Sequence, residues 1–384
     1  MRIAIDGRWF TKSSGGIVTY LTNLVKYLSR SDRENSYFIL VSDNKSYDFF
    51  SDMLSKNSNF NVQKINSTPY SPTEHIVIPE VLNTIKVDIL HSPHFMIPLI
   101  KTNTATIITI HDLMPFIFRE FLPPSKMKNF FPVYSTVINR TARFADHIIT
   151  VSKHSAKDII RILGVTRDKI TIIYSAADEG FRPLGKIKPT EVLNRYGIKR
   201  PFLLFVGRQE YNKNIPGIVE AFITVRNKGY NVQLVMVTEP GKFLKEVEPI
   251  LKDEGLLDDV IITGKVSQED LYDIYASAHT LLIPSFYEGF GLPAIEAMAC
   301  RVPVIVSDRS SLPEVVGDAG LYVNPDREDK IAEAIIQLLT NEKMKDRYAE
   351  RGYQRSKMFS WYKTVSDTVK VYEKVVAERA RKNQ

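Results

Sequence analysis

The sequence contains one cysteine among 384 residues, and no apolar run approaches the ~20 residues that a membrane-spanning helix requires. Because Cys300 has no second cysteine to pair with, a disulfide within the chain is excluded and a reducing compartment is expected. The N-terminus, MRIAIDGRWF, enters an alternating strand pattern directly, without the apolar core of a signal peptide. These features predict a cytoplasmic protein.

Signals of nucleic-acid and metal binding are also missing. The chain has no zinc-finger spacing, no basic arm and no RNA-binding signature, which argues against a nucleic-acid partner. It contains no Asp-x-Asp tripeptide, a common means of holding a divalent cation on a diphosphate. In HSPHFMIP, Pro93 spoils the helical spacing through which His91 and His94 could share a metal, and no third ligand is evident. We therefore expect no metal and no cofactor.

The net charge of +7 lies mostly in the first half of the chain. Residues 1–185 hold 22 Lys and Arg against 16 Asp and Glu, whereas the remainder is nearly neutral. A basic half predicts an anionic partner, such as phosphates or an anionic lipid surface.

Length and pattern together predict two α/β domains. A chain of 384 residues exceeds the size at which one core usually stops growing. Short β-branched runs alternate with helical patterns, which is typical of doubly wound parallel sheets. The expected strands are RIAIDG, YFILVS, NVQKI, DILHSP, ATIITIHD, HIITVS and KITIIY in the first half, and FLLFVG, VQLVMV, VIITG, TLLIPS, VPVIVSD and GLYVNP in the second. DEGFRPLGKIKPT is typical of a linker, so we place the domains at residues 1–183 and 184–361.

Ligands of such sheets bind beyond the carboxyl ends of the strands, so the polar residues that follow a strand are the candidates. After FLLFVG come Arg208 and Lys213, and two fixed cations suit a diphosphate that gains charge as it leaves. A solvated turn is the alternative interpretation of this cluster.

The stretch SFYEGFGLPAIE follows another buried strand. Gly289 and Gly291 allow close backbone approach to a ligand, and Pro293 suits the first turn of a helix whose amides can receive an anion. Glu288 then lies on the loop and Glu296 in the first helical turn, where both could accept hydrogen bonds from vicinal hydroxyls. This layout suggests a nucleoside diphosphate sugar. The alternative is that Glu296 only favours the helix dipole and Glu288 is an ordinary surface acid.

Three further strand ends carry weaker signals. Ser267 is expected to cap a helix and nothing more. Gly15 and Gly16 precede a helix in the first half and repeat the phosphate-loop pattern. His111, directly after ATIITI, could donate a hydrogen bond to a sugar or transfer a proton, or could be a satisfied structural histidine.

Together these motifs resemble the family-4 retaining glycosyltransferases of the GT-B fold, over almost the whole chain. EGFGLPAIE matches the E-x7-E motif of that family, and VGRQEYNKN matches its Arg-to-Lys diphosphate clamp. TIHD, ITVSKHS, IYSAADEGF and PVIVSDRSSLPEVVGDAGLYVNPDR follow in the expected order. The resemblance implies two Rossmann-like domains facing across a cleft, with the last helix, residues 362–384, crossing back to the first domain.

The resemblance also assigns roles to residues. Arg208 and Lys213 would stabilise the departing diphosphate, Glu296 would bind the ribose, and His111 would contact the transferred sugar. Arg208, Lys213, Glu288 and His111 are the expected catalytic residues. The expected donor-binding residues are Gly16, Gly207, Gly289, Phe290, Gly291, Leu292 and Glu296. Such enzymes are metal-independent and retain the anomeric configuration.

Two details refine these expectations. LHSP, TIHDL and the KN after the clamp are similar to bacterial mannosyltransferases of surface-polysaccharide assembly, which implies GDP-mannose as donor and a glycan or polyprenol-linked glycan as acceptor. The family often has Asn-Gly-x-Asp where this chain has Ser175-Ala176-Ala177-Asp178, a change that bears on acceptor contacts more than on donor binding.

The segment 115–145 combines six phenylalanines, Phe144 included, and five basic residues with a single acid, Glu120. Such a stretch could rest on an anionic bilayer and meet a lipid-linked acceptor. The alternative is a domain helix with a buried aromatic face and a solvated basic face. The residues concerned are Phe116, Phe118, Phe121, Phe130, Phe131, Arg119, Lys126, Lys128, Arg140 and Arg143.

Two other functions remain open at the level of sequence. A nucleotide-sugar epimerase or hydrolase would use the same donor without a glycan acceptor. A non-catalytic subunit would bind the nucleotide sugar without turnover, although the intact clamp and glutamate pair argue against it. Fold alone does not separate these functions.

Overall fold

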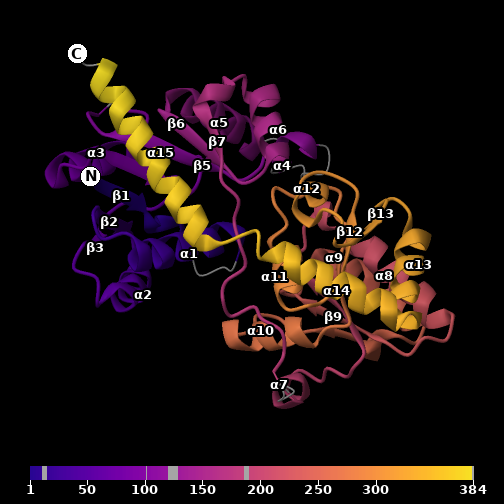
Figure 1. Cartoon of the computed structure of the whole chain (residues 1–384). Helices are drawn as coiled ribbons and strands as arrows, with labels where there is room; N and C mark the ends of the chain where they lie inside the picture. Colours follow the sequence, from indigo (N-terminus) through magenta and orange to yellow (C-terminus); the bar gives the residue numbers. More distant parts are fainter. Residues whose placement is uncertain (11–14, 101, 120–128, 186–189, 383–384) are drawn as a thin grey trace. The chain divides into compact units, whose positions relative to one another are not determined.

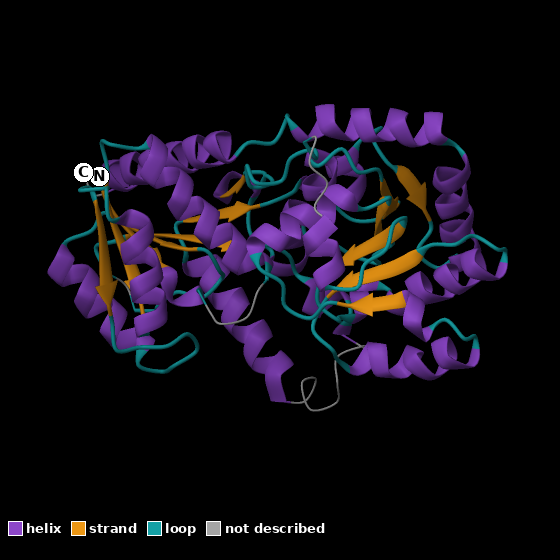
Figure 2. Cartoon of the chain, turned by 90° about the horizontal axis from the view of Figure 1, so that it is seen from below, coloured by secondary structure: helices purple, strands orange, loops and turns teal. Residues whose placement is uncertain are grey.

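The computed structural model describes residues 1–10, 15–100, 102–119, 129–185 and 190–382, and these form two compact α/β units. Unit 1 comprises Met1–Ser175 and Trp361–Gln384, and unit 2 comprises Ala176–Ser360. Each is built on a parallel sheet, with helices on both faces (Figure 2). The predicted α/β class with two doubly wound domains is confirmed.

The sheet of unit 1 has the order β3-β2-β1-β4-β5-β6-β7, and each strand coincides with one of the predicted runs. Its strands are β1 (Arg2–Asp6), β2 (Ser36–Val41), β3 (Phe60–Lys64), β4 (Ile89–Ser92), β5 (Ala105–Ile110), β6 (His147–Thr150) and β7 (Ile170–Ile172). The helices between them are α1 (Gly16–Ser31), α2 (Asn44–Leu54), α3 (Glu74–Ile85), α4 (Met114–Ile117), α5 (Phe131–Phe144) and α6 (Lys153–Leu163). β4 and β5 are buried along their whole length, polar residues included, as in the centre of a parallel sheet covered on both faces.

The last helix, α15 (Trp361–Lys382), packs on α1 and β5 of unit 1, as predicted (Figure 1). Trp361 is buried and stacks on Tyr27 at a ring-centroid distance of 6.2 Å. Further along the helix, Tyr372 Oη lies 2.7 Å from His91 Nδ1. The C-terminal segment thereby belongs to the core of unit 1.

The sheet of unit 2 has the order β10-β9-β8-β11-β12-β13, again from the predicted runs. Its strands are β8 (Phe202–Val206), β9 (Gln233–Val237), β10 (Val260–Ile262), β11 (Thr280–Ile283), β12 (Val304–Ser307) and β13 (Leu321–Val323). Its helices are α7 (Thr190–Arg195), α8 (Ile215–Asn227), α9 (Lys242–Asp253), α10 (Gln268–Ser277), α11 (Leu292–Ala299), α12 (Leu312–Val316), α13 (Glu328–Thr340) and α14 (Glu342–Ser356). An apolar core containing Phe222, Ile218 and Leu338 joins α8 and α13 to the sheet.

One helix expected from the sequence is in fact two. The pattern REDKIAEAIIQLLTNEKMKDRYAER predicts a single helix, but the chain leaves helical geometry at Asn341 (φ −124°, ψ 87°) between α13 and α14. The Asn341 side chain accepts a hydrogen bond from the Met344 amide at 2.9 Å. Asparagine therefore starts a new helix here by capping it, because its side chain replaces the missing backbone acceptor.

The two units divide earlier in the sequence than the boundary expected at 183/184. Asp178 accepts a hydrogen bond from Tyr272 Oη of α10 at 2.8 Å, and the ring of Phe181 packs against Tyr272 and Tyr275. The first part of the expected linker is thus fastened to unit 2.

In the described residues, no helix is both long and apolar enough to cross a membrane.

Candidate active site

Two adjacent strands of unit 2 bring the predicted clamp lysine and the first glutamate together. β8 pairs with β11 in parallel, so the loops that follow both strands begin at the same edge of the sheet. Lys213 Nζ lies 2.7 Å from Glu288 Oε1 and 2.8 Å from Oε2. The exposed fractions are only 16% for the Lys213 side chain and 9% for that of Glu288. The solvated-turn interpretation is therefore wrong for Lys213.

Two asparagines that the sequence did not single out fix this lysine. Asn212 donates from Nδ2 to the Tyr287 carbonyl at 2.9 Å, and its own carbonyl accepts from the Phe286 amide at 2.8 Å. Asn214 adopts the left-handed conformation (φ 53°) and caps α8 through Gly217 N. The loop after β8 is thereby bonded to the loop after β11 on either side of Lys213, which positions its side chain.

Glu288 has several partners but retains capacity to accept one more hydrogen bond. Its Oε1 accepts from Ser285 Oγ at 2.8 Å as well as from Lys213, while Oε2 accepts from Lys213. Its backbone amide donates to Ser310 Oγ at 2.9 Å, and its carbonyl accepts from Ser311 Oγ. Since a carboxylate offers about four lone-pair sites, one on Oε2 is left for a ligand hydroxyl.

Arg208 shares the loop with Lys213 but does not take part in the ion pair. Its side chain is 58% exposed, and its Nη1 lies 3.9 Å from Glu210 Oε1. The preceding Gly207 is half-buried, and a Cβ there would lie 3.3 Å from the Phe205 ring. The structure thus separates the predicted clamp into one fixed cation and one solvent-facing cation.

The glycine turn before α11 includes a backbone conformation that favours glycine. Gly291 has φ +93° and precedes α11, and a Cβ added there would lie 2.7 Å from Leu312 Cδ2. Pro293 occupies the first turn of α11, also as predicted. Phe290 is buried. The backbone of Gly289 to Leu292 therefore lies at the start of α11, the end of a helix at which an anion is favoured.

Glu296 lies in the second turn of α11, not in the first turn as expected, because α11 begins at Leu292. The helix-dipole interpretation of Glu296 is therefore wrong. Tyr275 Oη donates to Glu296 Oε2 at 2.7 Å, and the glutamate is buried. Burial raises the pKa of Glu296 to about 7; the hydrogen bond from Tyr275 opposes the shift and the nearby charge of Asp178 adds to it. The Ser175–Asp178 stretch, which the sequence associates with acceptor contacts, thus acts on a predicted donor residue.

His111 of unit 1 directly follows β5 and is half-buried. Its Nε2 lies 3.0 Å from the Pro93 carbonyl, which can only accept, so Nε2 carries the proton. Burial lowers the pKa of His111 to about 4, so the ring is neutral and Nδ1 is an acceptor. With Nε2 donating to Pro93, Nδ1 is the nitrogen of His111 that can accept a hydrogen bond, and the contact with a sugar stays a prediction.

Gly16 is the first residue of α1, and Gly15 precedes it. A Cβ at Gly16 would meet no atom of the described residues within 4 Å, so their packing does not require glycine there. Ser267 caps α10 by accepting from the Asp270 amide at 3.0 Å, as predicted. Within the described ranges, no group of three or more His, Cys, Asp or Glu could hold a metal ion.

Comparison with known proteins identifies the family. Residues 14–181 match the description "Glycosyltransferase Family 4", and residues 192–355 match "Glycosyl transferases group 1". O-antigen chain mannosyltransferase B of Escherichia coli is 32% identical over 294 residues, which is 76% of this chain and 76% of that protein. This chain belongs to glycosyltransferase family 4.

Other relatives and solved structures extend the comparison of this family-4 glycosyltransferase. The serotype-specific mannosyltransferase WbdA of E. coli is 26% identical over 75% of this chain, but the match spans only 36% of WbdA. Sucrose-phosphate synthase from Thermosynechococcus elongatus shares the fold with a TM-score of 0.78 at 18% identity, over 98% of this chain and 99% of the other. HepE from Anabaena, solved with UDP and glucose, has a TM-score of 0.77 at 16% identity, over 97% and 100%. These structures show that the glycosyltransferase has the GT-B fold.

Proposed function

We propose that this glycosyltransferase moves mannose from GDP-mannose to a glycan or polyprenol-linked glycan during surface-polysaccharide synthesis. The observation that carries the proposal is the pairing of Lys213 with Glu288 beside the Gly291 turn. The mannosyl specificity is supported by the similarity to O-antigen chain mannosyltransferase B. HepE was solved with UDP, so the fold accommodates other bases and the choice of GDP is tested separately below.

In this proposal Lys213 stabilises the diphosphate without leaving Glu288. An ammonium group has three donors, and two of them reach the Glu288 oxygens at 2.7 and 2.8 Å. The third donates to a phosphate oxygen, and Arg208 supplies a second, more exposed cation from the same loop. Charge that develops on the departing diphosphate is thereby neutralised by side chains, and no divalent cation is required.

The donor's two sugars bind on either side of the glycine turn. A hydroxyl of the transferred sugar donates to the remaining acceptor site of Glu288 Oε2, and the amides of Gly289 to Leu292 receive the β-phosphate. The ribose hydroxyls donate to Glu296, which Tyr275 orients. On unit 1, taken by itself, His111 Nδ1 can accept a hydrogen bond from a sugar hydroxyl, and Gly16, the first residue of α1, allows close approach of an anion.

We propose retention of configuration by attack on the same face as the departing diphosphate. Glu288 is held by Lys213 and Ser285, which makes it a poor nucleophile and favours a mechanism without a glycosyl-enzyme intermediate. The relatives reported above are transferases, and no observation supports an epimerase, a hydrolase or a non-catalytic subunit.

The test is product analysis with GDP-mannose and an oligomannoside acceptor. Extension of the acceptor with an α-linked mannose, unaffected by EDTA, supports the proposal. A β-linked product would contradict retention. Free mannose as the main product, with or without the oligomannoside, would favour hydrolysis. Parallel reactions with UDP-glucose and UDP-galactose test the donor, because preference for either would overturn the GDP-mannose assignment.

We further propose a cytoplasmic enzyme that contacts the membrane through residues 115–145. Phe131, Tyr134 and Ile138 form a buried face of α5, whereas Phe130 and Val133 are exposed, at 42% and 62%. Arg140 and Arg143 are exposed as well. Glu120, Phe121, Lys126 and Lys128 lie outside the described residues. The exposed apolar and basic side chains of α5 are the observation that favours contact with an anionic surface.

A further inference from the structure

A cavity of about 450 Å³ lies at the amino edge of the unit 1 sheet. Asp88, which lines it, directly precedes β4, and Asn103 and Thr104 precede β5, the neighbouring parallel strand. His111 follows β5 at the opposite end of the strand. The cavity is therefore separate from the strand-end residues of unit 1 described above.

Segments that are far apart in the sequence enclose this cavity. The end of α3 contributes Asn83 and Lys86, and the last turns of α15 contribute Arg379. Leucine, valine and alanine side chains form the remaining surface, and none of the described residues that line the cavity is aromatic. A cavity of this size and mixed polarity can hold a small organic molecule.

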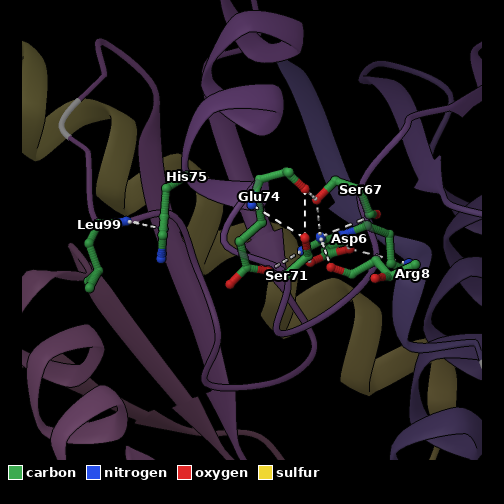
Figure 3. Close-up of polar contacts among 9 residues, drawn as sticks. Asp6, Arg8, Ser67, Ser71, Glu74, His75 and Leu99 are labelled. Atoms are coloured by element: carbon green, nitrogen blue, oxygen red, sulfur yellow. Dashed lines mark hydrogen bonds and ion pairs between the residues drawn. The ribbon is translucent and has the colours of Figure 1, made fainter.

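Two arginines from the ends of β1 hold α3, one wall of the cavity, at both of its ends. Arg2 donates from Nε to the carbonyls of Ile85 and Lys86, both at 3.1 Å, and from Nη2 to Ile85 at 2.7 Å. At the start of α3, the buried Glu74 accepts from Arg8 Nη2 at 3.2 Å (Figure 3). The wall is thereby preformed, which lowers the entropic cost of binding a ligand.

The helix α15 forms another wall and is bonded to the sheet on either side of the cavity. Tyr372 Oη lies 2.7 Å from His91 Nδ1 of β4. Arg379 follows two helical turns later, so it lies on the same face of α15. Its Nη2 donates to the Thr102 carbonyl at 2.7 Å, and its Nη1 lies 3.3 Å from Asp146 Oδ2. The guanidinium is thus fixed beside the cavity.

Both cations of the cavity have donors to offer a ligand. A guanidinium has five donors, and the contacts of Arg379 occupy two of them. Lys86 is exposed, and its ammonium has no hydrogen bond or ion pair with the described residues. Asp88 accepts from the Arg2 amide through Oδ2 at 2.7 Å, which leaves Oδ1 as an acceptor.

The backbone of Lys86 is unusual for a lysine. Lys86 caps α3 in the left-handed conformation (φ 51°, ψ 60°), and its amide donates to the Leu82 carbonyl. Glycine or asparagine usually occupies this position, because a side chain there is strained. The described residues give the ammonium no contact that offsets this strain, which indicates a partner outside the chain.

We propose that this cavity is a second ligand site, which binds a hexose phosphate. The phosphate oxygens accept from Arg379 and Lys86, because guanidinium and ammonium groups form charge-assisted hydrogen bonds with phosphate. The sugar hydroxyls bond to the side-chain amides of Asn83 and Asn103 and to the carboxylate of Asp88.

The cavity selects a hexose phosphate over a nucleotide, because its described lining has no aromatic ring on which a base could stack. The bound ligand bridges α3 and α15 and so stabilises the packing of the last helix on unit 1. This inference does not depend on which nucleotide sugar the enzyme uses.

Calorimetric titration of the full-length enzyme tests the site. The probes are mannose 6-phosphate, glucose 6-phosphate, mannose and inorganic phosphate, each with and without saturating GDP or UDP. We expect a hexose phosphate to bind roughly ten-fold more tightly than mannose or inorganic phosphate, since only it uses both sets of contacts, and to be unaffected by the nucleotides.

Two results of the titration would overturn the site. The first is an absence of binding by both hexose phosphates, or binding that a nucleotide abolishes. The second is inorganic phosphate that binds as tightly as the hexose phosphates, which would indicate an adventitious ion only.

Variants at Lys86 test the assigned contacts. Lys86→Asn removes the ammonium, whereas asparagine tolerates the left-handed backbone, so affinity for mannose 6-phosphate falls roughly ten-fold without loss of the fold. Lys86→Arg keeps a cation and retains most of the affinity. Lys56→Asn, at an exposed lysine just after α2 in the same unit, is the matched control and leaves the affinity unchanged. Equal affinities of Lys86→Asn and wild type would contradict the inference.

Hydrogen exchange read by mass spectrometry locates the ligand and separates this inference from the proposed function. Mannose 6-phosphate should protect amides at the end of α3 and in the last turns of α15, in the wild type and not in Lys86→Asn. Protection of the loops that follow β8 and β11 instead would overturn the cavity site and leave the transferase proposal intact. Failure of GDP-mannose transfer would leave the protection of α3 and α15 unchanged.

Discussion

The carboxyl edges of the two sheets have the same topology and opposite chemistry. In unit 2 the strand ends carry a cation and acids, with Lys213 and Glu288 paired at 2.7 Å. In unit 1 the strand ends carry imidazole and aromatic rings, and the one arginine at the end of β1, Arg8, is enclosed by Asp6 and Glu74. The more basic half of the sequence thus does not place an available arginine at this strand end. The net charge of a region therefore does not show where an anion binds. The position depends on which cationic side chains are enclosed by acids, as Arg8 is, and which keep a donor for a ligand, as Lys213 does.

The largest effect is expected from Lys213→Ala. Loss of the cation leaves the developing diphosphate charge unstabilised and Glu288 buried without a partner, so turnover falls by roughly 10³-fold. Single-turnover transfer from GDP-mannose measures the loss, and circular dichroism checks the fold. Lys330→Ala removes an exposed lysine from an ion pair with Glu333 in the same unit, at 2.8 Å. It is the matched control, and turnover within two-fold of wild type is expected. Near-normal turnover in Lys213→Ala would remove Lys213 from the mechanism.

The next largest effect is expected in the pH dependence of stability. Ionisation of Glu296 in unit 2 and of His91 in unit 1 should change the free energy of unfolding in opposite directions as the pH rises. Burial raises the pKa of Glu296 to about 7, so the folded state binds an extra proton between pH 4.5 and 7 and loses stability as the pH rises. Burial lowers the pKa of His91 to about 3, so the unfolded state binds the extra proton below pH 6.5 and stability falls as the pH falls.

Two variants separate these terms. Between pH 4.5 and pH 8, the free energy of unfolding of Glu296→Gln should rise relative to that of the wild type by on the order of 3 kcal/mol, since Gln cannot ionise. His91→Gln should show the opposite pH dependence. Its free energy of unfolding should rise relative to that of the wild type as the pH falls from 7.5 to 4.5. Urea denaturation across this pH range measures both. Parallel pH curves for either variant and wild type would contradict the assignment for that residue.

The glycine turn is expected to show a smaller effect. Gly291→Ala forces alanine to φ +93° and brings its Cβ to 2.7 Å from Leu312, so it should cost about 1–3 kcal/mol more than a change that meets only the backbone strain. Gly255→Ala, at φ +67° with no atom within 4 Å, is that control in the same unit. Equal losses in thermal stability would show that the turn can relax. Weaker nucleotide binding is expected only for Gly291→Ala.

The smallest effect is expected at the membrane. The wild type should sediment weakly with vesicles containing anionic lipid at low salt, and not at high salt, because surface attraction is screened. Arg140→Glu with Arg143→Glu should abolish the sedimentation, whereas Arg347→Glu with Arg351→Glu, on α14, should not. Sedimentation that is absent at low salt, or that α14 variants reduce equally, would contradict the contact through residues 115–145.

The fold and part of the site could be predicted because their signals are local. Runs such as ATIITI and TLLIPS specify buried strands by themselves, and Pro293 marks the first turn of α11. The helix break at Asn341 was missed because the helical pattern continues on both sides of this single capping residue.

Features that depend on contacts between distant residues could not be predicted. Tyr275, which donates to Glu296, and Asn212, which anchors the loop after β11, are separated from their partners by long stretches of chain. The proton on His111 Nε2 depends on the Pro93 carbonyl, which arrives from another strand end. Pairings of this kind follow from the packing of the sheet, and sequence spacing carries no signal of them.

The central claim is that the edge of unit 2 binds a nucleotide diphosphate through side chains, and a thermal-shift comparison tests it most directly. GDP, UDP, ADP and dTDP are compared at one common concentration, with and without EDTA. A ligand present at a hundred times its dissociation constant adds about 2.7 kcal/mol, which should raise the midpoint by roughly 5–10 °C. We predict this shift for GDP in wild type, unchanged by EDTA and largely lost in Lys213→Ala. No shift with any nucleotide, or a shift that EDTA abolishes, would contradict the claim.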